Sequence, residues 1–119
     1  MGFLVAPNES KTFNPTNRAM RTAIEEIIDN INPVDIDRPG KHATKGSAFR
    51  IDITPASDRQ MLVQMQYNHE TYATALFSLD LVPNIVENFE EFQTALKTVL
   101  ATCQSTGKNT IITWVADAT

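Results

Sequence analysis

The sequence predicts a single α+β domain in which an antiparallel β-meander sheet is covered by C-terminal helices. Two patterns support this fold class. Between Phe49 and Leu81, three successive runs alternate between apolar and polar residues, as half-buried strands do. After Pro83, apolar residues instead recur every three or four positions, as on an amphipathic helix. A chain of 119 residues with 42% hydrophobic content can bury one core, so we expect one domain.

The three alternating runs are joined by short links, which require neighbouring strands to be antiparallel. We place the meander within residues 47–82, with links at Pro55 to Asp58 and at Asn68 to Glu70. One face of the sheet is then apolar and the other largely polar. The predicted apolar face comprises Phe49, Ile51, Ile53, Met61, Val63, Met65, Tyr67, Ala73, Ala75, Phe77, Leu79 and Leu81.

A long helix is predicted directly after the meander. Asn84, with Glu87 three positions later, forms an Asn version of the capping box just after Pro83. The helix runs to about Gln104, and Gly107 suits its C-terminal exit. Its apolar stripe comprises Ile85, Phe89, Phe92, Leu96, Val99 and Cys103.

Two further segments have regular patterns. Thr16 to Ile31 has the spacing of an amphipathic helix, and Pro33 would stop that helix because the residue before a proline is disfavoured in the helical region. Thr110 to Ala118 fits a short helix and a strand equally well, so both alternatives stay open within a C-terminal part, residues 84–119, that is otherwise expected to be helical.

The remaining segments give weaker signals. The apolar run from Phe3 to Ala6 fits an edge strand that turns near Pro7 toward Thr12. Residues 34–46 are polar and contain the Pro39-Gly40 pair, which is typical of a loop.

No pattern in the chain predicts catalysis, a metal site or a cofactor. Neither a Gly-rich phosphate loop nor a cluster of metal ligands occurs, and His42 and His69 stand alone in predicted links. Cys103 has no second cysteine to pair with, so we interpret it as a small buried side chain in a protein compatible with a reducing cytoplasm. The longest apolar runs are far shorter than the roughly 20 residues that span a membrane.

Charge argues against strong non-specific binding to nucleic acid, because the net charge is −4. The distribution is uneven, however. A basic region lies between Arg38 and Arg59, and acidic residues gather at Glu87, Glu90 and Glu91. The ordinary interpretation of both groups is a solvated surface. The basic region comprises Arg38, Lys41, Lys45, Arg50 and Arg59.

The polar face of the predicted sheet is the most informative group of side chains. Its amides and hydroxyls can hydrogen-bond exposed base edges, Tyr72 can stack on an unpaired base, and Arg50 can meet a phosphate. The competing interpretation is that an antiparallel sheet simply has one face in water. The face comprises Arg50, Asp52, Thr54, Gln60, Gln64, Gln66, Tyr72 and Thr74.

The order of elements from Ser47 to Thr119 resembles that of coat proteins of single-stranded RNA bacteriophages. The stretches that carry the resemblance are F-R-I-D-I-T-P-A-S-D-R-Q-M-L-V-Q-M-Q, E-T-Y-A-T-A-L-F-S-L-D-L, F-Q-T-A-L-K-T-V-L-A-T-C-Q and I-I-T-W-V-A-D-A. The opening segment, residues 1–15, resembles the family's N-terminal hairpin with Asn8-Glu9 at its turn. The family has strands where Thr16 to Ile31 has a helical pattern, so that segment is left as helix or strand.

The resemblance implies a non-enzymatic protein with no cofactor. Two chains would interlock into a dimer, with the helices of each crossing the partner's sheet, and the dimers would assemble a small icosahedral shell in the bacterial host cytoplasm to form the virion. The inner sheet face would bind a stem-loop of the viral single-stranded RNA, which selects the genome and represses translation. The implied RNA-binding residues are Arg50, Thr54, Gln64, Gln66, Tyr72 and Thr74.

A second hypothesis comes from a different class of function. The acidic start of the long helix, with Glu87, Glu90 and Glu91, fits a small phage or bacterial inhibitor that binds a host protein. Shells formed by the protein expressed alone would favour the coat hypothesis, whereas a stable one-to-one complex with a host protein would favour the inhibitor.

Overall fold

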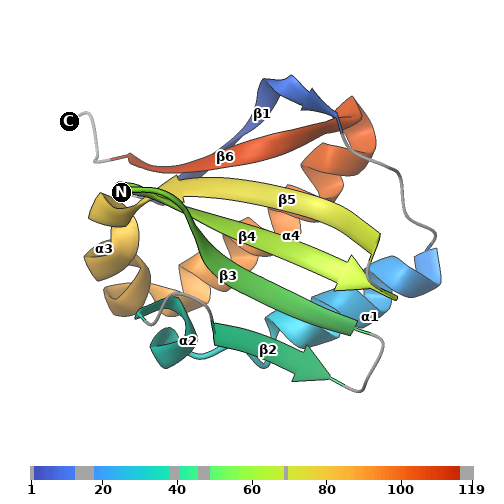
Figure 1. Ribbon diagram of the computed structural model, residues 1–119, viewed down its shortest axis with the longest axis horizontal. Coiled ribbons are helices and arrows are strands. Elements are labelled where there is room, and N and C mark those ends of the chain that lie inside the picture. Colours follow the sequence, from blue (N-terminus) through green and yellow to red (C-terminus); the bar gives the residue numbers. More distant parts are fainter. Residues whose placement is uncertain (1, 13–17, 38–40, 46–48, 69, 116–119) are drawn as a thin grey trace.

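The computed structural model describes residues 2–12, 18–37, 41–45, 49–68 and 70–115. These residues form an α+β fold, as predicted, with one open sheet and helices on one of its faces (Figure 1). The strands are β1 (Gly2–Thr12), β2 (Lys41–Lys45), β3 (Phe49–Ser57), β4 (Gln60–Tyr67), β5 (Glu70–Ser78) and β6 (Lys108–Val115). The helices are α1 (Arg18–Ile28), α2 (Pro33–Asp37), α3 (Val82–Glu87) and α4 (Phe89–Thr106).

The sheet is mixed rather than a pure meander. Its strand order is β1-β6-β5-β4-β3-β2. β5 and β6 are parallel and are connected through α3 and α4, as a parallel pair requires, while the other neighbours are antiparallel. The described part of the sheet therefore contains the predicted meander, β3 to β5. It is extended on one side by β2, which precedes β3 in the chain, and on the other side by β6 and β1.

The meander itself is confirmed, with two corrections at its ends. β3 continues through Pro55 to Ser57, so its link to β4 is shorter than the predicted turn at Pro55 to Asp58. β5 ends at Ser78, and a short 3-10 turn, Leu79–Leu81, follows. The hydroxyl of Ser78 accepts a hydrogen bond from the Asp80 N–H at 3.1 Å, which helps to end the strand.

The predicted N-terminal hairpin is wrong for the residues that are described. β1 runs as one strand and pairs with β6, so Asn8 and Glu9 lie within a strand and not at a turn. The Glu9 carboxylate is paired with the Lys108 ammonium at the start of β6. The hairpin fails because β1 finds its partner about a hundred positions away, a pairing that no local pattern indicates.

The segment Thr16 to Ile31 can be a helix or a strand by its sequence and its resemblance, and its described part is helical. α1 places Ile24, Ile27 and Ile28 in the core, each at most 1% exposed. The side-chain amide of Gln93 on α4 donates to the Ile28 carbonyl oxygen at 3.1 Å, which satisfies a carbonyl at the end of α1.

The predicted loop at residues 34–46 is also wrong in part. Pro33 begins α2, where a proline at the first helical position loses no hydrogen bond, and Ile36 lies in the core at 1% exposure. Lys41–Lys45 forms β2, an edge strand whose backbone pairs with β3. The sequence of β2 shows no alternation of apolar and polar residues. The strand is held at the sheet edge by backbone hydrogen bonds to β3, and these do not require such a pattern.

The long C-terminal helix is confirmed in position but is broken at Asn88, where the backbone leaves the helical region at φ −124° and ψ 49°. Asn84 lies inside α3, so the predicted capping box is wrong. The carbonyl oxygen of Asn84 accepts hydrogen bonds from both the backbone N–H and the side-chain amide of Asn88, each at 3.0 Å. Asn88 therefore closes α3 and begins α4.

The last described segment resolves the choice between helix and strand. Residues 108–115 form β6, so the expectation of a helical end is wrong there. Thr110 pairs with Ala75 and Ile111 with Leu76 in the parallel ladder. Ile112 is fully buried, and Trp114 packs against the core.

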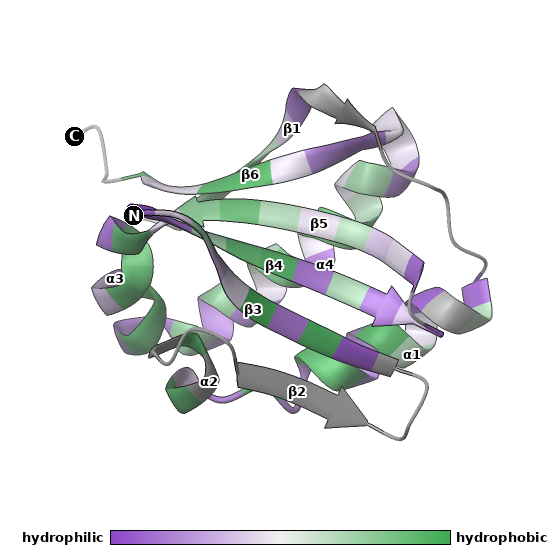
Figure 2. Cartoon of the chain, viewed as in Figure 1, coloured by the Kyte–Doolittle hydropathy of each residue, from purple (hydrophilic) through white to green (hydrophobic). Residues whose placement is uncertain are grey.

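The core lies between the sheet and the helix layer. Figure 2 shows apolar residues alternating with polar ones along β3 and β4. α4 packs on β1, β5 and β6, and α1 packs on β3 and β4. The chain's own helices thus bury the apolar sheet face. The buried members of the predicted apolar face are Ile51, Ile53, Met61, Val63, Met65, Ala73, Ala75, Phe77 and Leu81, whereas Leu79 is exposed.

Gly107 is the predicted helix exit and adopts the left-handed conformation, with φ +70°. Its N–H donates to the Cys103 carbonyl oxygen at 2.9 Å. A Cβ at this position would meet no atom within 4 Å, so the cost of a side chain is one of backbone conformation. We expect Gly107→Ala to lower the free energy of unfolding by about 1–2 kcal/mol. Urea titration measures this loss. Gly107→Asn should lower the free energy of unfolding by less than Gly107→Ala, and equal losses for the two variants would contradict this explanation.

Candidate functional site

The candidate site is the sheet face opposite the helices, which we call the open face. Figure 1 shows α1 and α4 behind the sheet, with the open face toward the viewer. Side chains on this face are mostly half-buried by their neighbours, in contrast to the fully buried side chains that alternate with them. Five of the six predicted RNA-binding residues, Arg50, Thr54, Gln64, Gln66 and Thr74, lie here.

Strand register arranges the open face in three cross-strand rows. The first row contains Arg50, Gln66 and Thr71, and the second contains Asp52, Gln64 and Thr74. The third row contains Thr54, Leu62 and Leu76 and is more apolar. Cross-strand neighbours lie roughly 4.5–5.5 Å apart, so each row presents adjacent groups to a ligand.

The charge of these rows is internally compensated. The Arg50 guanidinium lies 3.1 Å from the Asp52 carboxylate and also donates to the Gln66 side-chain oxygen at 3.2 Å. Asp52 is only 5% exposed, so Arg50 also satisfies a carboxylate that is largely removed from water. Arg50 is therefore partly neutralised before any phosphate approaches.

A depression of about 420 Å³ lies on the open face beside the second and third rows. None of its lining side chains is charged. Leu62, Leu76 and Ala56 supply apolar surface, and amides and hydroxyls surround them. Such a lining suits a flat, neutral, polar-edged group rather than an ion. The complete lining is Asn8, Ala56, Gln60, Leu62, Gln64, Thr74, Leu76, Asn109 and Thr110.

Several residues of the open face are not indicated by the local sequence patterns, among them Asn8, Asn109 and Thr71. Asn8 and Asn109 reach the depression because β1 and β6 join the sheet, which the local patterns do not reveal. Thr71 joins the first row because of an irregularity in the pairing of β4 with β5. The density of polar residues around Asn8 is a weak sequence signal that could have drawn attention to it.

Tyr72, the sixth predicted residue, is not on the open face, so the prediction that it stacks on RNA there is wrong. Met65 pairs with Ala73 but Gln66 pairs with Thr71, so Tyr72 is an extra residue in a β-bulge. The bulge turns Tyr72 into the core, where it is 8% exposed and its ring lies 6.4 Å from that of Tyr67.

The Tyr72 hydroxyl donates to a Glu70 carboxylate oxygen at 2.6 Å. This hydrogen bond, with a smaller effect of burial, raises the pKa of Tyr72 above its ordinary value. The hydrogen bond therefore joins two residues at the start of β5, and burial of the ring holds this part of the strand against the core.

Cys103 is fully buried in α4, as predicted, and burial raises its thiol pKa because the thiolate is disfavoured away from water. Among the described residues, no group of three or more histidine, cysteine, aspartate or glutamate side chains is placed to hold a metal ion. The side chains of His42, Arg38, Lys41 and Lys45, and residue His69, lie outside the described part.

No helix in the described ranges combines the length and apolar character that crossing a bilayer requires.

Comparison with known proteins returned no match: no family model, curated protein or solved structure resembles this chain closely enough to report.

Proposed function

We propose that this protein is a non-enzymatic RNA-binding protein of the phage coat type, whose open face recognises unpaired bases. The observation that carries the proposal is the uncharged, amide-lined depression beside the rows of glutamines and threonines. Glutamine and asparagine amides can form paired hydrogen bonds with base edges, and adenine is their preferred partner. The proposal includes dimerisation, assembly of a shell in a bacterial host, and binding of a viral stem-loop, as the resemblance implies.

The electrostatics specify the kind of binding that we propose. The net charge is −4, and Arg50 already contacts Asp52. Phosphate attraction is therefore a small part of the affinity, and base contacts supply most of it. An unpaired loop fits this requirement because its base edges are free, whereas the bases of a duplex are paired.

The salt dependence of binding tests directly how the affinity is divided between phosphate contacts and base contacts. Each neutralised phosphate of a single strand contributes about −0.7 to the slope of log K against log salt. Because the three rows contain one cation, Arg50, we expect a slope no steeper than about −0.7 for a stem-loop with an adenine-containing loop. A much steeper slope would mean that phosphate contacts from elsewhere in the chain dominate.

Gln64 is the best position for a substitution, because it belongs to the second row and also lines the depression. We expect Gln64→Ala to weaken binding of the stem-loop by about tenfold or more, since one base contact contributes roughly 1–3 kcal/mol. Fluorescence anisotropy with labelled RNA measures the change. Gln104→Ala is the matched control, because Gln104 lies on α4 in the helix layer and bonds Arg21.

Equal affinity for Gln64→Ala and the control would contradict base recognition on the open face. Arg50→Ala is a poorer test, because it would leave the Asp52 carboxylate without Arg50 and so destabilise the fold.

A second candidate function is the inhibitor that binds a host protein. One observation favours it: Val86 is 42% exposed beside Glu87, and together with Glu90 and Glu91 they line a shallow hollow at the junction of α3 and α4. An exposed apolar side chain within an acidic surface fits a basic protein partner. Val86→Lys should abolish such a complex and leave RNA binding unchanged, which separates the two candidates.

A further inference from the structure

The edge strand β1 differs in composition from β2, the strand at the other edge of the described sheet. In the sheet order β1 and β2 are the two edge strands. Edge strands commonly carry charges that prevent pairing with another chain, and β2 has lysines at both of its ends. The first half of β1, residues 2–7, reads G-F-L-V-A-P and contains no charge.

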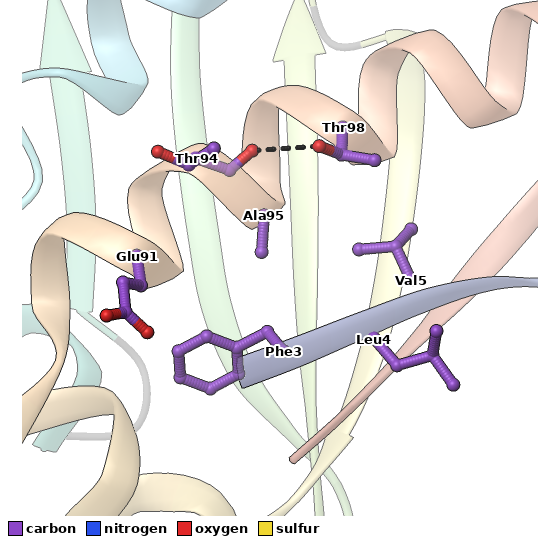
Figure 3. Close-up of a pocket in the computed structure, with 7 residues that line it drawn as sticks. All are labelled: Phe3, Leu4, Val5, Glu91, Thr94, Ala95 and Thr98. Carbon is purple, nitrogen blue, oxygen red and sulfur yellow. Dashed lines mark hydrogen bonds between the residues drawn. The ribbon is translucent and has the colours of Figure 1, made fainter. Parts of the chain in front are cut away.

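Apolar surface is exposed on both sides of this edge. On the open face, Leu4 is 53% exposed and Val115, on the neighbouring strand, is 46% exposed. On the helix side, β1 and α4 together line a groove of about 430 Å³ (Figure 3). Its lining comprises Phe3, Leu4, Val5, Glu91, Thr94, Ala95 and Thr98.

Apart from Glu91 at one end, the α4 wall of the groove is built from short side chains. The Thr98 hydroxyl donates to the Thr94 carbonyl oxygen at 3.1 Å, drawn as the dashed line in Figure 3, and the Thr94 hydroxyl donates to the Glu90 carbonyl oxygen at 3.2 Å. Their hydroxyls are thus satisfied within the helix. With Ala95 between them, this wall permits another helix to approach closely.

We propose that a second copy of this chain docks here, its β1 pairing antiparallel with β1 about a two-fold axis near Leu4. The sheets of the two copies would then be continuous. α4 lies over β1 and β6, and paired strands are about 4.8 Å apart, so the two copies of α4 would come to roughly the 8–10 Å at which helices pack. Their short side chains would fill the groove from both sides.

A second copy fits this surface better than an isolated peptide strand does. A peptide would satisfy the β1 backbone but would leave the α4 wall uncovered, whereas the copy supplies both a strand and a helix. Figure 3 shows Glu91 at the Phe3 end of the groove and Thr98 at the Val5 end. A two-fold axis between them places the two Glu91 side chains at opposite ends of the interface, so they do not oppose one another.

This inference deepens the proposed function, and it rests on that function for the role of the dimer in a shell. The interface itself involves no RNA. In this dimer each α4 stays on its own sheet, so it would take the place of the interlocked dimer that the resemblance implies. The test therefore uses purified RNA-free protein, so that its failure is distinct from a failure of RNA binding.

Sedimentation analysis of the wild-type protein should show a dimer. Leu4→Lys should weaken dimerisation at least tenfold, because it brings two ammonium groups together on the axis. Val34→Lys is the matched control, since Val34 is 49% exposed and lies on α2, which packs near β2 at the other edge. Circular dichroism and Tm should be alike for the two variants, which checks that both fold.

A second measurement does not depend on a disruptive substitution. Leu4→Cys should form an intermolecular disulfide under mild oxidation, because directly opposite residues of an antiparallel pair are within disulfide distance. Val34→Cys should remain reduced under the same conditions. A monomeric wild-type protein, a dimer that Leu4→Lys leaves intact, or equal cross-linking of the two cysteine variants would each overturn the proposal.

Discussion

Phe92→Ala is expected to lower the free energy of unfolding by about 3–5 kcal/mol, the usual cost of removing a fully buried aromatic ring. Phe92 is completely buried, and its ring lies 5.5 Å from that of Phe3 and 5.9 Å from that of Phe77. It therefore joins α4 to β1 and to β5 at once. No neighbouring side chain can fill the space without moving one of these elements, so a cavity remains.

Urea unfolding followed by circular dichroism measures this loss. Phe89→Ala is the matched control, because Phe89 is only partly buried against the core. Its ring centroid lies 6.3 Å from that of Phe92. We expect the control to lose less than half as much. Similar losses for the two variants would mean that Phe92 does not hold the central position that its ring contacts indicate.

Tyr72→Ala is expected to destabilise the fold strongly, whereas Tyr72→Phe should retain most of the stability. The ring fills part of the core beside Tyr67, and the hydroxyl adds one hydrogen bond to Glu70. Because the ring points away from the open face, Tyr72→Phe should leave the affinity for the RNA stem-loop unchanged. A weakened affinity in a folded Tyr72→Phe variant would return Tyr72 to the binding surface and contradict the bulge.

The same residue predicts a dependence of stability on pH. The pKa of Tyr72 is raised in the folded state, chiefly by its hydrogen bond to Glu70. The associated stability is therefore fully present below the unfolded pKa of about 10, and it is lost as pH rises through the folded pKa. Above about pH 10, Tm should fall more steeply for the wild type than for Tyr72→Phe, and parallel curves would contradict this assignment.

The three strands of the meander and the apolar stripe of α4 could be predicted because their signals are local. Alternation at Ile51, Ile53 and Val63 places one face of each strand in the core, and all three side chains are fully buried. The spacing of Phe92, Leu96 and Val99 does the same for the helix. In both cases apolar residues recur in the sequence with the same period at which the backbone places side chains on one face of the element.

Tyr72 shows where local alternation fails. A single inserted residue in β5 shifts the side-chain order, so that Thr71 replaces Tyr72 in the row of Gln66. Nothing in the run E-T-Y-A-T-A announces the bulge, because threonine and tyrosine suit either face of a strand. Five of the six predicted residues therefore lie on the open face, as the alternation indicates, and Tyr72, the extra residue of the bulge, does not.

The sequence by itself determined which segments are amphipathic, and thus the meander, the long C-terminal helix and the polar character of the face between Phe49 and Ser78. The tertiary structure alone decided that β1 and β6 pair and extend the sheet, which brings Asn8 and Asn109 to the depression. The physical reason is the range of the interactions. Periodicity reports burial of a segment's own face, whereas strand pairing between distant segments uses backbone groups that every sequence has.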